Sequence, residues 1–289
     1  MYKQQLCLAI NDQFGIPSEE QIGLFKRTGF DGFAIDISDR SKNAPELAAI
    51  GKKENMIITS LHAPFDRSAD MWHGGESGDE AAAELIECIE LCARLEIPIT
   101  VAHTFIGFGC KKTPTDAGIE RYGRAAKRAG ELGVKLALEN TEGEEYLAAL
   151  MTALKSEKSV GFCWDTGHEL CYNRGKDLAA LYGERMIVTH LNDNLGVKNF
   201  AGEITYIDDL HLLPFDGIGD WSGIARRLAE CRFSGPLTFE LNTKSKPGRH
   251  ENDCYSAMPV ELYLAEAFKR ACRVAALFIK AREELKNEQ

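Results

Sequence analysis

The sequence lacks any apolar run close to the roughly 20 residues that a transmembrane helix requires. Its first ten residues, MYKQQLCLAI, contain an apolar stretch that is too short for a secretory signal peptide. Both absences predict a protein that has no membrane partner.

Paired cysteine motifs are also absent. The nine cysteines are scattered and odd in number, and none belongs to a CxxC pair. Cys88 and Cys92 lie one helical turn apart, a spacing that favours packing within a helix over a disulfide. The pattern is typical of a reduced, cytoplasmic protein.

Positive charge is scarce relative to negative charge. The chain of 289 residues has 34 Lys and Arg against 44 Asp and Glu, for a formal net charge of -10. Nucleic-acid-binding proteins usually present a basic face, so no nucleic-acid partner is expected. A linker, a low-complexity tract and a strong internal repeat are also missing, which predicts one domain over residues 1–289.

What the sequence does contain is a regular alternation of strand and helix patterns. Short apolar runs predict strands at 5–10, 33–37, 56–61, 99–102, 135–138, 160–164, 186–189 and 236–239. Helical spacing and capping residues predict helices at 19–27, 45–54, 76–95, 115–132, 144–155, 177–182, 221–231 and 260–286, with Ser18 as the cap of the first. Eight such units in this length indicate an α/β fold, a single (β/α)₈ TIM barrel.

The stretch VGFCWDTGH at 160–168 shows where chemistry enters this pattern. Asp165 falls where a buried strand ends, Thr166 and Gly167 break the strand, and His168 follows. A carboxylate and an imidazole at a strand end can bind a divalent metal. A capping Asp and a surface His would explain the same letters.

The same arrangement recurs at the ends of six successive strands, from the third to the eighth. The residues are His62, His103, Glu139, Asp165, His190 and Glu240. In a TIM barrel these ends meet on one face, where active sites lie. Any one alone could be a structural polar group, but the series predicts a metal site. Mixed imidazole and carboxylate ligands suit Zn²⁺ or Mn²⁺, with Mg²⁺ and Co²⁺ left open.

A further pair lies in the long polar loop between the seventh strand and the next helix. Asp209 and His211 are two residues apart, and in an extended segment they would point to the same side. With His168 they could hold an additional metal, although a stray Asp and His in a surface loop is an alternative.

The order of these motifs resembles the xylose-isomerase-like superfamily, over about residues 55–242. The superfamily includes sugar phosphate isomerases and epimerases and, more distantly, type IV apurinic endonucleases. The motifs are LHAP, AHTF, LENT, WDTGH, THLND, DLHLLP and FELN. The resemblance implies that the isomerase metal is held by Glu139, Asp165, His190 and Glu240. It also implies that the further ligands of the endonucleases' three-metal cluster match His62, His103, His168, Asp209 and His211.

The resulting hypothesis is a metal-dependent isomerase or epimerase of a small carbohydrate: a keto sugar, a sugar phosphate or an inosose-like hydroxy-ketone. The metal would polarise the carbonyl, and Glu139 and Glu240 would transfer the proton through an enediolate. Alternatives are an endonuclease-like phosphodiester hydrolase with several metals, a dehydratase or lyase on the same scaffold, and a non-enzymatic metal-bound sugar sensor. A homo-oligomer is left open.

Other side chains near the expected barrel mouth are weaker candidates for substrate contacts. Aromatic residues there could shield the site from water, with loop packing as the alternative: Phe65, Trp72, Phe105 and Phe108. Cations after the last strand could bind an anionic group of the substrate, with a solvated charge run as the alternative: Lys244, Lys246, Arg249 and His250.

Overall fold

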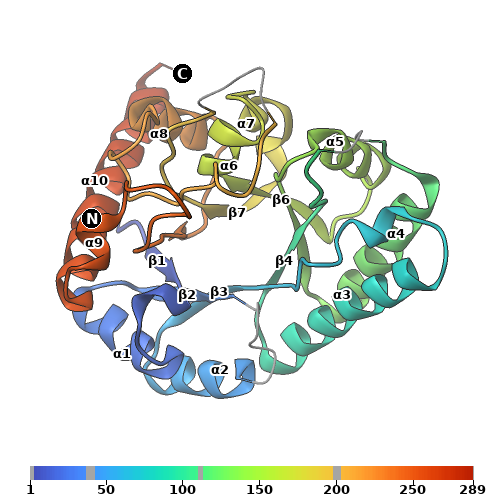
Figure 1. Cartoon of the computed structure of the whole chain (residues 1–289), viewed down its shortest axis with the longest axis horizontal. Coiled ribbons are helices and arrows are strands. Elements are labelled where there is room, and N and C mark those ends of the chain that lie inside the picture. Colours follow the sequence, from blue (N-terminus) through green and yellow to red (C-terminus); the bar gives the residue numbers. More distant parts are fainter. Residues whose placement is uncertain (1–2, 37–42, 110–112, 198–202, 289) are drawn as a thin grey trace.

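The computed structural model describes residues 3–36, 43–109, 113–197 and 203–288, and its centre is an eight-stranded parallel sheet (Figure 1). The strands are β1 Leu6–Ala9, β2 Gly32–Ile35, β3 Ile57–His62, β4 Ile99–His103, β5 Lys135–Glu139, β6 Val160–Asp165, β7 Met186–His190 and β8 Leu237–Phe239. Hydrogen-bonded neighbours follow the order β7-β6-β5-β4-β3-β2-β1-β8. The sheet closes between β7 and β8, where Leu191 N–H donates to Thr238 O at 2.8 Å.

Helices surround the strands on the outside of the barrel (Figure 1). The α-helices are α1 Ser18–Thr28, α2 Ala44–Lys53, α3 Glu76–Leu95, α4 Asp116–Leu132, α5 Glu144–Ala153, α6 Thr166–Cys171, α7 Leu178–Tyr182, α8 Trp221–Glu230, α9 Asp253–Ser256 and α10 Val260–Asn287. Short 3-10 helices are η1 Asp12–Phe14, η2 Asp70–Trp72 and η3 Gly183–Arg185. The predicted single (β/α)₈ TIM barrel is thus confirmed.

The strands are almost fully buried because they have a core on each side. The larger core fills the space between the strands and the outer helices. A smaller one lies inside the barrel and consists of Val101, Ala137, Cys163 and Val188 from β4 to β7. Both sides being apolar explains why the strand patterns read as continuous apolar runs rather than as alternating ones.

Three predictions about the elements need correction. The segment after Asp165, predicted as a turn, is the short helix α6, and α9 after β8 was not predicted. Ser18 does not cap α1; it is the first helical residue, and Pro17 occupies the N-cap position with no side-chain hydrogen bond. Proline suits the start of a helix because its fixed φ is compatible with that position.

The described cysteines are all free, including Cys88 and Cys92, which are buried in α3 as predicted. Within the described part of the chain, no helix has the length and apolar character needed to cross a membrane.

Candidate metal centre

Sheet register brings the motif residues of neighbouring strands side by side. His103, at the end of β4, is paired with Glu139, at the end of β5. Glu139 is in turn paired with Cys163 on β6, and Asp165 with His190 on β7. The polar side chains therefore meet because parallel strands end at one face of the barrel, as the sequence pattern predicts.

Two asparagines fasten these strand ends together. Asn140 accepts a hydrogen bond from the Asp165 backbone N–H at 2.8 Å, and its Nδ2 donates to Asp165 O at 2.9 Å. Asn192 donates from Nδ2 to Asp165 Oδ2 at 2.9 Å, and its carbonyl accepts from Thr166 Oγ1 at 2.7 Å. Hydrogen bonds thus connect the motifs LENT, DTGH and HLND, and those of Asn192 orient the Asp165 carboxylate.

Gly167 is required by this close packing. A Cβ atom at this position would lie 1.8 Å from Asn192 Oδ1, well inside contact distance. The following residue, His168, donates its backbone N–H to Asp165 Oδ1 at 2.7 Å, so Asp165 caps α6. The capping interpretation and the proposed ligand role of Asp165 are compatible, because the carboxylate has a second oxygen.

A central group of four residues lies where β5 to β8 end. His190 Nδ1 is 3.2 Å from Glu139 Oε1 and 3.0 Å from Glu240 Oε2. One donor atom from each of Glu139, Asp165, His190 and Glu240 falls within a common 4.8 Å. These are the four residues predicted to hold the isomerase metal.

A second group shares Glu139 and adds two histidines. His62 Nε2 lies 3.1 Å and His103 Nε2 lies 3.5 Å from Glu139 Oε2. Glu139 therefore offers one oxygen to this pair and the other oxygen to His190, which is a bridging arrangement.

A third group forms around the long loop after β7. His168 Nε2 lies 3.5 Å from Asp209 Oδ1, and His211 Nε2 lies 3.0 Å from Asp209 Oδ2. Donor atoms of Asp165, His168 and His211 also lie within 4.8 Å of one another. Asp209 and His211 meet, but the predicted extended segment is wrong, because His211 has a φ of 48°. Such a left-handed residue is held by its surroundings at a cost in backbone energy.

Asp193 fixes the loop that carries this third group. Its Oδ1 accepts the Gly219 N–H at 2.9 Å, and its Oδ2 accepts Trp221 Nε1–H at 2.7 Å and the Phe215 N–H at 2.9 Å. The Asp193 backbone also pairs with Leu212 in both directions at 2.9 Å. This pairing lies next to His211, so the buried carboxylate determines where the loop residues sit.

The cluster is buried and strongly charged. Burial alone would raise the pKa of Glu139, but His190 and His103 hold that pKa well below its usual range. Burial would likewise raise the pKa of Glu240, yet His190 and His211 lower it to about 2. In Asp165 the effect of burial dominates and raises the pKa to about 6. These pKa directions indicate carboxylates that depend on the positive charge of their neighbours.

A divalent cation fits this donor set. Four carboxylates lie together in this cluster. Glu139 and Asp165 are fully buried, whereas the side chains of Asp209 and Glu240 are 13% and 21% exposed. Buried carboxylates need compensating positive charge, and the neighbouring imidazoles supply it only when they are protonated. Lys246 Nζ, 3.9 Å from Asp209 Oδ2, is a further cation beside this cluster among the described residues. Asp209 Oδ1 is also buried without a hydrogen-bond partner among the described residues, as a metal ligand would be in the absence of its ion. Five of the seven histidines of the chain belong to the cluster.

The aromatic candidates have different positions. Phe65 lies against the second group, with its ring stacked on that of His103 at 4.6 Å. The prediction that Trp72 and Phe105 contact the substrate needs correction, because both side chains are buried in the core. Trp72 Nε1 donates to a backbone carbonyl, and Phe105 stacks on Tyr146 at 4.2 Å. For these two, loop packing is the better interpretation. Phe108 contacts the Tyr172 ring at 5.8 Å.

The basic candidates after β8 are only partly near the cluster. Lys246 Nζ lies 3.9 Å from Asp209 Oδ2 and is the basic side chain closest to the third group among the described residues. Arg249 pairs with Glu251 at 2.7 Å, and His250 is exposed and pairs with Asp253 at 2.9 Å. Lys244 is exposed, and its backbone N–H donates to a glutamine side chain. For Lys244, Arg249 and His250, a solvated or locally paired charge is the better interpretation.

Some functional positions were not predicted from the sequence. Asn140, Asn192 and Asp193 organise the site, and the letters that encode them stand inside the motifs LENT and HLND. Cys163 places a thiol within the reach of Glu139 and His190. The sequence could have indicated this position, because residues two apart on a strand face the same side and Cys163 lies two residues before Asp165.

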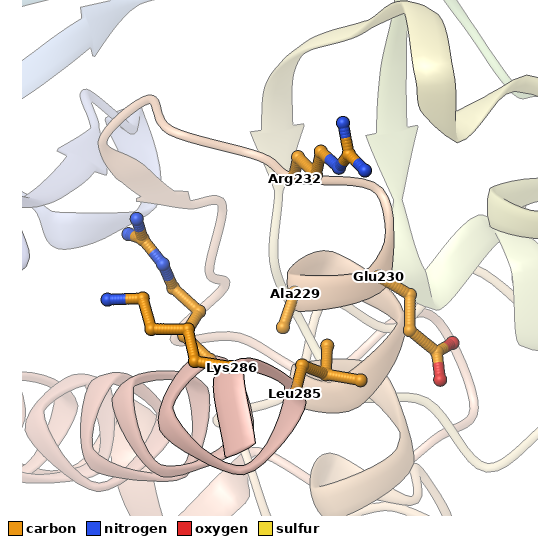
Figure 2. Close-up of a pocket in the computed structure, with 6 residues that line it drawn as sticks. Ala229, Glu230, Arg232, Leu285 and Lys286 are labelled. Carbon is orange, nitrogen blue, oxygen red and sulfur yellow. The ribbon is translucent and has the colours of Figure 1, made fainter. Parts of the chain in front are cut away.

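Two surface pockets differ in their relation to this cluster. One, of about 420 Å³, adjoins it, because its lining includes Tyr172, whose ring lies 4.8 Å from that of His168. The other, drawn in Figure 2, lies between the C-terminal ends of α8 and α10, with Glu230 and Arg232 on one side and Lys286 on the other. These helix ends lie at the opposite end of the barrel from the strand tips, and active sites of this fold are not expected at that end.

Comparison with known proteins places this geometry in context. A region of a "Probable endonuclease 4" from Cenarchaeum symbiosum is 32% identical over 153 residues, 49% of this chain and 52% of that protein. The crystal structure titled "IOLI protein with a binding zinc atom" has a TM-score of 0.75 at 19% identity, covering 94% of this chain and 98% of that one. L-ribulose 3-epimerase has a TM-score of 0.73 at 13% identity, covering 99% and 98%.

These similarities differ in extent. The chain spans between 34% and 57% of the length of four curated relatives, three of which are named probable endonuclease 4. The solved structures are matched along nearly their whole length, but at identities that establish the fold alone. A family model described as xylose isomerase-like TIM barrel matches residues 22–269. The chain therefore belongs to the xylose isomerase-like TIM barrel family.

Proposed function

We propose that this protein is a metal-dependent isomerase or epimerase of a keto sugar, a sugar phosphate or a related hydroxy-ketone. The observation that carries the proposal is the placement of Glu139 and Glu240. Glu139 ends β5 and Glu240 directly follows β8, two strands that are not adjacent, yet both carboxylates reach His190 Nδ1, at 3.2 and 3.0 Å. Two carboxylates that approach one point from different strands can remove and return a proton.

In this proposal the central group holds a divalent ion through Glu139, Asp165, His190 and Glu240. The bound ion supplies Lewis acidity toward the substrate's carbonyl and neighbouring hydroxyl oxygens. One glutamate takes the proton from the carbon next to the carbonyl, and the other returns it to a neighbouring atom or to the opposite face. Phe65, stacked on His103, covers part of the cluster and helps to exclude water.

The ligand chemistry and the comparisons support this choice. Imidazole with carboxylate suits Zn²⁺ or Mn²⁺, and a solved structural neighbour is titled as binding zinc. Neighbours with matching folds include L-ribulose 3-epimerase and D-psicose 3-epimerase. The excess of negative charge also suits a small-molecule substrate better than a DNA duplex.

Solvent exchange tests the proposal directly. The protein is loaded with Zn²⁺ or Mn²⁺ and incubated in deuterated water with a panel of ketoses and inosose-like ketones. NMR should show deuterium at a carbon next to the carbonyl, since the proton passes through an enediolate that exchanges with solvent. Chelator-treated protein and Glu139→Gln are the controls, and both should leave the substrate unlabelled.

A specific observation favours a second candidate, phosphodiester hydrolysis at an abasic site. Beyond the central four, five more metal-competent side chains lie in the cluster: His62, His103, His168, Asp209 and His211. An isomerase with one metal would not require them, whereas a hydrolase that uses several metals would.

Metal content and a DNA substrate separate the two candidates. Elemental analysis of the protein after loading gives the number of metal ions per chain. In parallel, an abasic-site duplex is incubated with the same preparation. We expect the duplex to remain intact, and incision at catalytic rates, with no deuterium exchange in any ketose, would replace the isomerase proposal by the hydrolase.

A further inference from the structure

Three histidines of the cluster share one hydrogen-bonding arrangement. Each has its Nδ1 on a backbone carbonyl and its Nε2 directed at a carboxylate. The Nδ1 contacts are His62 with Ala63 O at 2.7 Å, His168 with Asn140 O at 2.9 Å and His211 with Glu240 O at 3.2 Å. A carbonyl on Nδ1 keeps the proton there and leaves the Nε2 lone pair for a metal, while it also fixes the orientation of the ring.

His103 departs from this arrangement. Its Nε2 faces Glu139 Oε2 at 3.5 Å, as in the other histidines, but its Nδ1 is buried without a hydrogen-bond partner among the described residues. A buried polar atom without a partner costs about 1–3 kcal/mol, so such atoms are rare in folded proteins. A partner for His103 Nδ1 must therefore come from outside the polar atoms of the described residues.

Ser68 also has a buried polar atom without a hydrogen-bond partner among the described residues. It lies in the loop after β3, it is 6% exposed, and its hydroxyl is likewise buried with no partner among the described residues. Ser68 and His103 line the same cavity of about 20 Å³. Its other walls include apolar Pro64 and Met71 and the charged pair Arg67 and Glu84, whose side chains bind each other at 2.8 Å. One water molecule needs about 10–15 Å³ and at least two polar partners, and this cavity provides both.

We propose that an ordered water fills this cavity and bridges Ser68 Oγ and His103 Nδ1, so that Ser68 positions His103 as a metal ligand. The water does for His103 what backbone carbonyls do for His62, His168 and His211. It accepts the Nδ1 proton, fixes the tautomer and holds the ring against Phe65. The positioning role rests on the proposed metal-dependent function, whereas the water site itself does not.

The water is tested first without metal. High-resolution crystals of the metal-free protein should show one ordered water within hydrogen-bond distance of both Ser68 Oγ and His103 Nδ1. The Ser68→Ala variant should lose that water or lose its order. A dry cavity in the wild type, or a direct Ser68–His103 contact, would overturn the inference.

The positioning role is tested by Zn²⁺ affinity, measured in competition with a chelator. Loss of an outer hydrogen-bond partner of a metal-bound histidine typically weakens affinity by about 10–100-fold, and we expect Ser68→Ala to fall in this range. Ser68→Thr retains the oxygen and should bind close to the wild type. Ser159→Ala is the matched control, because it removes another buried hydroxyl, which donates to Ala126 O at 2.8 Å at the other end of the barrel.

The outcomes separate this inference from the proposed function. Wild-type Zn²⁺ affinity in Ser68→Ala, with the water visible in the crystal, would overturn the positioning role and leave the isomerase proposal intact. If the wild type binds no Zn²⁺, the proposed metal centre and the positioning role both fail, and the metal-free crystal still decides the water site.

Discussion

The metal-competent side chains are held in two different ways, depending on whether a strand or a loop carries them. Glu139, Asp165 and His190 are the last residues of their strands, and sheet register together with motif asparagines determines their separation. Asp209 and His211 lie on an irregular loop, and His211 has a left-handed backbone. Sites on strands are positioned more precisely than sites on loops. This difference leads us to expect that the strand-borne group holds the metal required for proton transfer. The loop-borne pair, Asp209 and His211, would modify that site or hold an additional metal.

The largest effect is expected from the two glutamates of the central group, Glu139 at the end of β5 and Glu240 directly after β8. Glu139→Gln and Glu240→Gln keep the shape of the side chain and one coordinating oxygen, but they remove the base. Since a positioned proton-transfer group contributes about 10²–10⁴-fold, turnover should fall by at least that factor in each variant. Steady-state kinetics on the substrate found by deuterium exchange gives the measurement.

The matched control is Glu142→Gln, which changes a buried glutamate in the same β5–α5 connection that lies outside the metal-competent groups. The double Glu139→Gln and Glu240→Gln variant should lose less than the product of the single losses, because both residues serve one intermediate. Near-normal turnover in Glu240→Gln with metal still bound would assign the second proton transfer to another group, with His62 or His211 as the next candidates.

The loop that carries Asp209 and His211 should lose its conformation when the hydrogen bonds of the Asp193 carboxylate are removed. In Asp193→Asn an amide NH₂ replaces one of two oxygens that accept hydrogen bonds from Gly219, Phe215 and Trp221. A hydrogen bond to a charged group contributes about 1.5–3 kcal/mol, so we expect a loss of about 3 kcal/mol in the free energy of unfolding. Urea denaturation gives this value, and limited proteolysis should cut first within 203–219.

Asp220→Asn is the control for Asp193→Asn, since it changes a nearby aspartate that caps α8 through Gly223 N–H at 3.0 Å. Equal losses in the two variants, with no preferential cleavage of the loop, would show that Asp193 is not the anchor of the third group.

The difference between strand and loop also explains which parts could be predicted. Helix α3 was predicted with its exact bounds, 76–95, because its apolar spacing is local. Strand-end residues were placed correctly because register in a parallel barrel follows from the fold. The conformation at His211 could not be predicted, since tertiary hydrogen bonds impose its positive φ. The burial of Trp72 could not be predicted, because nothing in the sequence shows that its ring packs between Tyr122 and Tyr146. One domain over residues 1–289 and a cytoplasmic location stay predictions.

A smaller effect on stability is expected from Gly167, which packs against the Asn192 side chain that binds Asp165. Gly167→Ala places a methyl group 1.8 Å from Asn192 Oδ1. Asn192 must move, and its hydrogen bond to Asp165 Oδ2 is lost. Overpacking of a tight interior typically costs about 1–3 kcal/mol, and a lower Tm with reduced metal content should accompany it.

Gly175→Ala is the control for Gly167→Ala. Gly175 has no atom near its would-be Cβ, but its φ is 71°, so the cost there is backbone strain alone. If Gly167→Ala lowers Tm like Gly175→Ala but keeps full metal content, Asn192 does not orient Asp165 for the metal.

The smallest expected effect decides between the two candidate functions. Asp209→Asn removes the charge between His168 and His211 without changing shape. If the strand-borne group carries an isomerase, metal should be lost only from the loop-borne group, and turnover should fall by no more than about tenfold, the lower end for a supporting residue. Asp208→Asn is the control, because this neighbouring carboxylate accepts a hydrogen bond from Thr205 N–H at 2.9 Å and belongs to none of the three metal-competent groups of the described residues. A hydrolase that needs all its metals would instead lose nearly all its activity in Asp209→Asn. Metal content per chain, measured beside turnover, shows whether the loop-borne group was emptied, so that preserved activity can be assigned to the strand-borne group alone.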